Sequence, residues 1–212
     1  MPGILYHLSF AELVFRKVSN KLPINKVDFM SGNLIPDLAK DKKSAHYSIP
    51  ASHECFFVPN MEIVTKKLSV PENSIKFGIF CHLYLDYHFI ESFLIPEFIW
   101  DNENNKVINP RNNKEWTRNE FFSNSGMYGS YTEINTLMIK NGHIPLDTIS
   151  KIPNTLPNSG IEIFDSRREK TWRDELNEYL SENREYTGDV FNYERLWNFI
   201  TEISKHFTKE IL

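Results

Sequence analysis

The chain is poor in cysteine, with only Cys55 and Cys81 among its 212 residues. Two cysteines do not build the disulfide framework of a small secreted domain, and they form no CxxC zinc site. Both lie in apolar stretches, which predicts buried free thiols. A metal site in this protein is therefore expected to use imidazole and carboxylate ligands, which suit zinc and similar divalent metals.

The chain also lacks blocks of one charge and unbroken apolar runs. Its formal net charge is −4 and no Lys/Arg block stands out, which argues against an extended nucleic-acid surface. A pocket for a single phosphate stays open as an alternative, because a metal ion can supply positive charge locally. The longest apolar stretch, residues 75–100, is interrupted by histidines and acids, so no transmembrane helix is expected.

Several signature motifs are missing. The sequence has no GxSxG, P-loop, GxGxxG or CxxC pattern, so serine or cysteine nucleophile chemistry has no support. The first residues carry neither a basic region nor a long apolar region, so no secretory signal is expected and a cytoplasmic protein is the default.

The composition that is present is globular, with 41% hydrophobic and 25% charged residues. The length suits one domain over residues 1–212, and the 14% of aromatic residues favours a well-filled interior or an apolar pocket. We therefore expect an ordered protein with a substantial core.

The hydrophobic pattern is mainly helical. Apolar residues recur at helical spacing in four segments, which are residues 6–18, 71–96, 126–140 and 192–211. No series of strands is evident, and residues 101–116 indicate a loop or hairpin. We predict an all-α, single-domain bundle with loop insertions, in which the helix over 71–96 is long, buried and central. The acidic segment 161–188 is a candidate flap over this bundle.

His82 and Asp86 are four residues apart in the buried part of the central helix, so they share one face with Gly78. A buried carboxylate is costly unless a positive group meets it, and a metal ion would satisfy both side chains. A small residue at Gly78 leaves room for a ligand or another backbone. The alternative is a buried His–Asp pair that bonds to neighbouring helices.

Three further residues are candidate ligands. Asp37 follows Pro36 on an expected loop, His46 lies in a polar loop, and His7 lies at a helix start. Taken singly, these residues suit a turn cap, an exposed histidine and a half-buried polar contact. Their combined order with His82 and Asp86 favours a shared site.

The segments Phe29–Asp37, Ser44–Tyr47 and Gly78–Asp86 resemble the zinc-dependent phospholipase C and single-strand nuclease superfamily. The opening Met1–His7 looks like the start of its short, intracellular bacterial members, and the resemblance covers roughly residues 1–95.

The resemblance implies a ligand set. Asp37, His46 and His82 would hold one ion, Asp86 would bridge, and His7 would serve a second ion. Members of the family also carry a further histidine after the HxxxD aspartate and a second HxxxD or HxxxE pair.

In this chain, the residues that could supply such a further histidine and second pair, and so hold a third ion, are poorly placed. His88 is two residues after Asp86 and so points away from the His82 face. His143 and Asp147 have the right spacing, but they flank Pro145 at a turn. His53, seven residues after His46, is an alternative ligand to the residues above, although a surface position is favoured for it. We therefore expect one or two ions of zinc or another divalent metal.

These observations predict a metal-dependent hydrolase of a phosphoester, similar to a phosphodiesterase or phospholipase C, that uses metal-activated water. Asp37 and Asp86 are the candidate catalytic residues, and the substrate would be a small phosphorylated molecule or a lipid head group. Two alternatives remain. One is a non-catalytic metal-binding helical protein. The other is an HD-type phosphohydrolase, whose adjacent His-Asp dipeptide is absent here.

Overall fold

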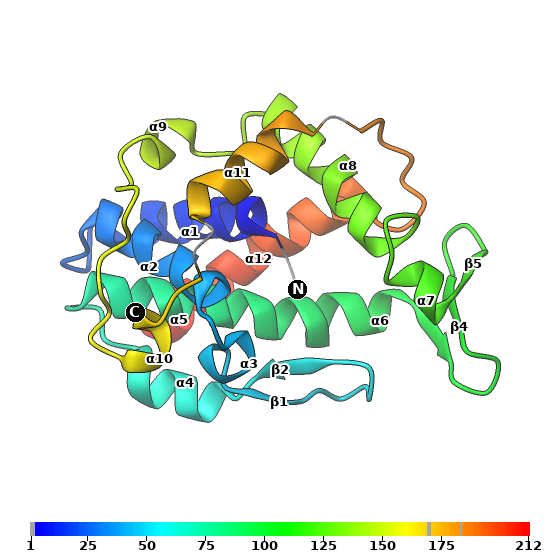
Figure 1. Cartoon of the computed structure of the whole chain (residues 1–212), viewed down its shortest axis with the longest axis horizontal. Coiled ribbons are helices and arrows are strands. Elements are labelled where there is room, and N and C mark those ends of the chain that lie inside the picture. The colour runs from blue at the N-terminus through cyan, green and yellow to red at the C-terminus, as the bar shows by residue number, and fades with distance from the viewer. Residues whose placement is uncertain (1–2, 169–170, 183) are drawn as a thin grey trace.

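A computed structural model describes residues 3–168, 171–182 and 184–212 of the protein (Figure 1). Most of these residues are helical. The larger helices are α1 (Ile4–Val18), α2 (Lys26–Leu38), α4 (Met61–Leu68), α5 (Ser74–His88), α8 (Met127–Lys140), α11 (Trp172–Ser181) and α12 (Tyr193–Ile211). Short helices are α3 (Lys42–Ala45), α6 (Ile95–Glu97), α7 (Arg118–Phe121), α9 (Leu146–Ile149) and α10 (Glu162–Asp165).

The centre of the molecule is a helical rod. Helix α5 continues through a π-helical segment, η1 (Phe89–Leu94), into α6, and ten consecutive residues of α5, Phe77–Asp86, are buried. The buried central helix expected over residues 71–96 is thus confirmed. It begins later than expected, at Ser74, because the Asn73 side chain accepts a hydrogen bond from the Lys76 amide and caps the helix there.

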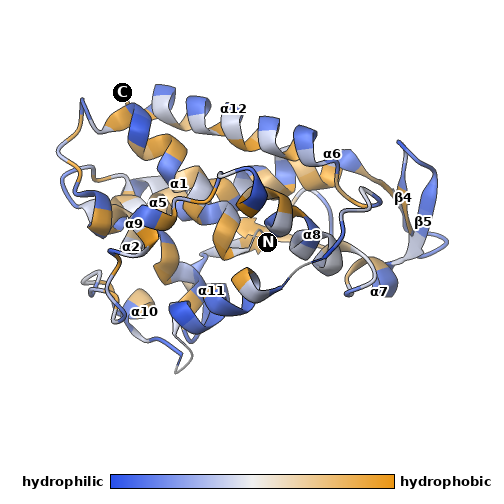
Figure 2. Ribbon diagram, turned by 90° about the horizontal axis from the view of Figure 1, so that it is seen from above, coloured by the Kyte–Doolittle hydropathy of each residue, from blue (hydrophilic) through white to orange (hydrophobic). Residues whose placement is uncertain are grey.

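Helices α1, α2 and α12 pack against α5, and α1 also packs against both α2 and α12. Helix α12 has the apolar face that its period predicts. It turns buried side chains such as Leu196 and Phe207 inward, whereas its polar face remains outside (Figure 2). The helices expected over 6–18, 126–140 and 192–211 are confirmed as α1, α8 and α12.

Helices α2 and α5 approach each other closely at two glycines. A Cβ atom built on Gly78 would lie 2.0 Å from the Phe29 carbonyl oxygen, and one on Gly32 would lie 2.1 Å from the Ile75 carbonyl oxygen. Both oxygens belong to the backbone, which cannot move aside as the end of a flexible side chain could. The space kept by Gly78 therefore holds another backbone, and it sets the distance between the two helices.

One boundary expectation was wrong. Asp37 was expected on a loop after Pro36, but α2 continues to Leu38 and includes both residues. Proline lacks a backbone N–H and so removes one hydrogen bond of α2, and the buried Leu34, Ile35 and Leu38 hold the last turn in place.

The fold is also not purely helical. One antiparallel pair joins β1 (Ser48–Pro50) to β2 (Phe57–Pro59), and a three-stranded sheet joins β3 (Ile99–Asp101), β4 (Lys106–Asn109) and β5 (Lys114–Thr117). The hairpin alternative for residues 101–116 is confirmed, whereas the first pair was missed. Its strands are three residues each and contain prolines, so they carry no alternating pattern to recognise.

Within the acidic segment 161–188, the described residues include α10 and α11. Helix α11 lies across α1 and α8 on one side of the bundle (Figure 1). Cys81 is buried and Cys55 is only half-buried, and both are free thiols. No helix among the described residues is long and apolar enough to cross a membrane.

We predict that Gly78→Ala lowers the free energy of unfolding by about 3 kcal/mol, because the new methyl group would collide with the α2 backbone. Urea unfolding measures this change. Gly3→Ala is the matched control, since its Cβ would meet only the Tyr179 ring at 4.0 Å. Equal stabilities of the two variants would contradict the proposed role of the glycine contact.

Candidate metal centre

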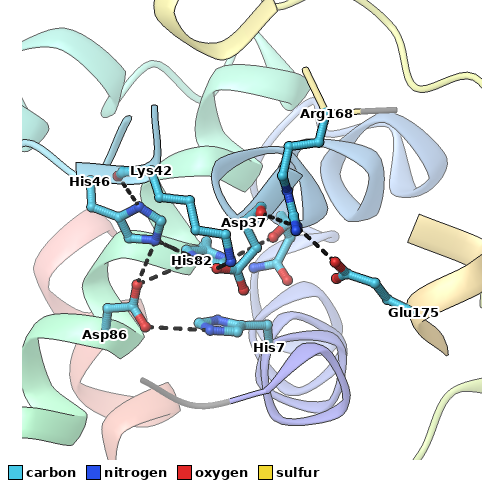
Figure 3. A network of polar contacts seen from close by, with 9 residues as sticks. His7, Asp37, Lys42, His46, His82, Asp86, Arg168 and Glu175 are labelled. Atoms are coloured by element: carbon cyan, nitrogen blue, oxygen red, sulfur yellow. Dashed lines mark hydrogen bonds and ion pairs between the residues drawn. The ribbon is translucent and has the colours of Figure 1, made fainter. Parts of the chain in front are cut away.

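Four elements bring the predicted residues to one place (Figure 3). His7 comes from the first turns of α1, Asp37 from the end of α2, and His46 caps the C-terminus of α3. His82 and Asp86 lie one turn apart on α5. Three helices and one helix cap therefore converge on a single cluster.

The side-chain atoms of this cluster are nearly in contact. Asp86 Oδ2 lies 3.2 Å from His46 Nε2 and 3.3 Å from His82 Nε2, and Asp86 Oδ1 lies 3.4 Å from His7 Nε2. The two Nε2 atoms of His46 and His82 are 3.3 Å apart. Asp37 Oδ1 is 3.9 Å from His46 Nε2. The structure thus brings all five predicted residues together.

Burial differs between the two carboxylates. Asp86 is fully buried, as are the three histidines, whereas the Asp37 side chain retains 20% exposure. Asp37 is therefore the carboxylate of the cluster that reaches solvent.

The outer ring nitrogens of two histidines are fixed by backbone carbonyls. His82 Nδ1 lies 2.8 Å from the Asn33 carbonyl oxygen, and His46 Nδ1 lies 2.7 Å from that of Lys42. A carbonyl oxygen only accepts, so both Nδ1 atoms must carry the hydrogen. In the neutral rings, both Nε2 atoms then present lone pairs toward Asp86.

At the centre of the cluster, the Asp86 carboxylate oxygens and the imidazole nitrogens therefore face one another as hydrogen-bond acceptors. Among the described residues, no hydrogen bond reaches either Asp86 oxygen or either His7 ring nitrogen, and the imidazole nitrogens lie 3.2–3.4 Å from the Asp86 oxygens as ion-pair contacts. Buried acceptors that face one another repel unless a positive charge lies between them. That charge is either a proton on an imidazole or a metal ion.

The charges of the cluster perturb one another. Burial acts to raise the pKa of Asp86, but the neighbouring histidines outweigh it and hold the pKa well below its usual range. For His46, burial acts to lower the pKa, and the carboxylates of Asp86 and Asp37 outweigh it and raise the pKa. Burial and the nearby His7 lower the pKa of His82. His82 therefore favours the neutral form that metals require.

Two overlapping sets of three residues have the geometry of ligand groups. His7, Asp37 and His82 form one set, and His46, His82 and Asp86 form the other, each with ligand atoms within 4.8 Å of one another. Two ligands about 2.0–2.2 Å from a tetrahedral zinc ion lie about 3.3–3.6 Å apart, and the His46, His82 and Asp86 atoms lie 3.2–3.3 Å from one another. His82 belongs to both sets.

The other candidate histidines lie elsewhere. His53 accepts from the Cys55 amide and packs on Trp100, and His88 lies against Tyr84 with Nδ1 3.4 Å from Ser92 Oγ. The expectation that His88 points away from the cluster is confirmed.

His143 is stacked on Trp197 at 3.7 Å between ring centroids, and its Nδ1 is 2.8 Å from the Tyr193 hydroxyl. Asp147 lies in α9 and lines a different cavity. Among the described residues, neither joins the two ligand sets.

The sequence did not reveal the residues that surround Asp37. Lys42 Nζ lies 3.1 Å from Asp37 Oδ1, and Arg168 donates at 2.7 Å both to the Asp37 carbonyl oxygen and to Glu175 (Figure 3). Lys42 belongs to no recognisable motif, and Arg168 carries no local signal because its partner is 131 residues away.

Comparisons of the chain with models of known protein families, with curated proteins and with solved structures found no match. The interpretation of the cluster therefore depends on its own geometry.

We predict that His46 and His82 both carry their hydrogen on Nδ1 at alkaline pH, because backbone carbonyls hold those atoms. Long-range ¹H–¹⁵N NMR of the metal-free protein measures the tautomer directly. Hydrogen on Nε2 in either ring would remove the argument that lone pairs meet at Asp86.

Proposed function

We propose that this protein is a metal-dependent hydrolase of a small phosphoester, with zinc or another divalent ion held by the five-residue cluster. The observation that carries the proposal is the set of buried acceptor atoms around Asp86. Three imidazoles and two carboxylates form a donor set that suits zinc, and the Nδ1 hydrogen bonds to carbonyls orient two of the rings as metal-bound histidines are usually oriented.

His82 would be the central ligand, because it belongs to both sets. His46 and Asp86 complete one set, and His7 and Asp37 complete the other. This grouping differs from the one that the family resemblance implied, in which Asp37 and His46 share an ion. We propose one ion or two, because two overlapping ligand sets are present.

A divalent ion in such a site makes hydroxide available from water near neutral pH. The partly exposed Asp37 is the carboxylate that can accept a proton from attacking water, and Asp86 is buried where it balances charge. Lys42 beside Asp37 places a positive charge where a phosphoryl group would enter. Asp37 therefore carries the catalytic role in this proposal.

The proposed substrate is a small phosphorylated molecule or a lipid head group. A cleft of about 420 Å³ opens beside Asp37 and Lys42, a volume typical of small-ligand sites. Two free thiols and the absence of a disulfide among the described residues suit a reducing compartment, so we also propose a cytoplasmic location.

We predict that metal-free protein takes up zinc, and that His82→Ala loses most of it because both ligand sets share His82. Equilibrium dialysis with elemental analysis measures the content, and zinc should raise the melting temperature of the wild type but not of the variant. Affinity should fall at acid pH, because protons compete for the ligand atoms.

His143→Ala is the matched control, since this histidine lies in a separate stack with Trp197. It should retain zinc fully. A wild type without zinc affinity, or equal losses in both variants, would leave a protonated histidine–carboxylate network as the correct interpretation.

We predict chelator-sensitive hydrolysis of bis(p-nitrophenyl) phosphate, with kcat lowered at least about 100-fold in Asp37→Asn. The substitution keeps the size of the side chain but removes the proton acceptor. Release of p-nitrophenol measures the rate, and zinc content is checked on the same sample. Zinc-loaded protein that hydrolyses no phosphodiester or phosphomonoester in a broad screen would favour a non-catalytic metal-binding protein.

A further inference from the structure

The cleft beside Asp37 has two chemically different walls. Helix α8 contributes one wall, with Tyr128, Tyr131, Thr132 and Asn135. Helix α11 and the residue after it contribute the other, with Glu175, Glu178, Tyr179 and Glu182. Asp37 and Lys42 lie at the end that adjoins the ligand cluster.

The α8 wall contains two buried polar groups without a partner. Tyr131 is 7% exposed and Asn135 is 2% exposed, and neither the Tyr131 hydroxyl nor the Asn135 side-chain oxygen meets a hydrogen-bond partner among the described residues. Each such group costs on the order of 1–3 kcal/mol. The two residues are four apart and share one helix face, so the unmet groups belong to the same wall.

Packing fixes the direction of the Tyr131 side chain. Its ring lies 5.6 Å from the Tyr6 ring in an edge-on contact and 5.5 Å from the Phe191 ring in a stacked contact. Burial, with the charges of Tyr128 and Asp86, raises the pKa of Tyr131 well above its ordinary value. The phenol therefore keeps its hydrogen and remains a donor at neutral pH.

The α11 wall is acidic. It carries three glutamates, Glu175, Glu178 and Glu182, spaced about one helical turn apart. Among the described residues that line the cleft, Lys42 is the one basic side chain. Glu175 is held by Arg168, and Glu182 accepts from the Thr132 hydroxyl at 2.9 Å. This wall admits a compact ligand but repels the further phosphates of a polynucleotide.

We infer that this cleft is the substrate site, that the Tyr131 hydroxyl donates to the phosphoryl end of a compact phosphoester, that the Asn135 side-chain oxygen accepts from a hydroxyl of the same ligand, and that the α11 glutamates exclude polyanions. The inference rests on the proposed function for the presence of an ion beside the cleft. It adds the binding residues and the class of substrate that is rejected.

The first test is Tyr131→Phe in the full-length, zinc-loaded protein, with inorganic phosphate as the probe in titration calorimetry. Phosphate should bind about tenfold more weakly, which corresponds to about 1.4 kcal/mol for one hydrogen bond to an anion. The urea midpoint should stay the same or rise, because the variant removes a buried hydroxyl that has no partner in the free protein.

Tyr193→Phe is the matched control. Its hydroxyl is bonded to His143 and Asn141 away from the cleft, so this variant should lose stability and keep its phosphate affinity. Unchanged phosphate affinity in Tyr131→Phe, or a loss of affinity accompanied by a loss of stability, would overturn the binding role.

The same samples separate the two proposals. Wild-type protein that binds zinc and phosphate but hydrolyses nothing overturns the proposed function and leaves the cleft assignment standing. Hydrolysis by wild type with no effect of Tyr131→Phe overturns only the cleft assignment.

The second test addresses the acidic wall through Glu182→Gln, which keeps an acceptor for Thr132 and removes one charge. A fluorescein-labelled single-stranded oligothymidylate should bind about three- to tenfold more tightly than to wild type at low salt, and the gain should shrink as salt rises. Fluorescence anisotropy measures the affinity.

Glu103→Gln makes the same charge change in the turn between β3 and β4, where the side chain is exposed. It should change the oligonucleotide affinity little. An equal effect of Glu103→Gln and Glu182→Gln would show that the net charge of the protein alone weakens oligonucleotide binding, and would overturn the role of the α11 wall.

Discussion

The backbone contact between α2 and α5 is the constraint on which the rest of the structure depends. Gly32 and Gly78 let the two helices approach until no side chain fits between them. This approach places the Asn33 carbonyl within hydrogen-bonding distance of His82 Nδ1, which fixes the ring that both ligand sets share. A helix crossing one methyl group wider would separate His82 from its carbonyl partner and from the side chains that approach it from α1 and α3.

The same helix pair determines what each carboxylate can do. Asp86 faces inward from the middle of α5 and is surrounded by imidazoles, whereas Asp37 lies in the last turn of α2 and reaches solvent. Arg168 fastens this last turn to α11 by bonding both the Asp37 carbonyl oxygen and Glu175. The acidic α11 wall is thereby tied to the residue proposed for proton transfer, so the position of the cleft and the position of Asp37 are set together.

The sequence pattern predicted those features that depend only on residues close together in the chain. Helical periods located α1, α5, α8 and α12, and the i, i+4 spacing placed His82 and Asp86 on one face, because both are properties of a few adjacent turns. Pro36 was misread because the packing of the last α2 turn, rather than the sequence, allows the helix to continue. Lys42, Arg168 and Tyr131 became visible only when distant segments met, since their significance lies in their partners and not in any motif.

The net charge of the cluster determines which ligands the adjoining cleft attracts. With neutral histidines, Asp37 and Asp86 give the site two negative charges, which one divalent ion would neutralise and a second would reverse. A phosphoryl group carries negative charge, so a site with one ion depends on Lys42 and on neutral donors such as the Tyr131 hydroxyl to receive it. The acidic α11 wall works in the opposite direction along the side of the cleft that faces α8. Attraction is thus confined to the end beside the cluster, which favours a ligand whose negative charge is concentrated on one phosphoryl group.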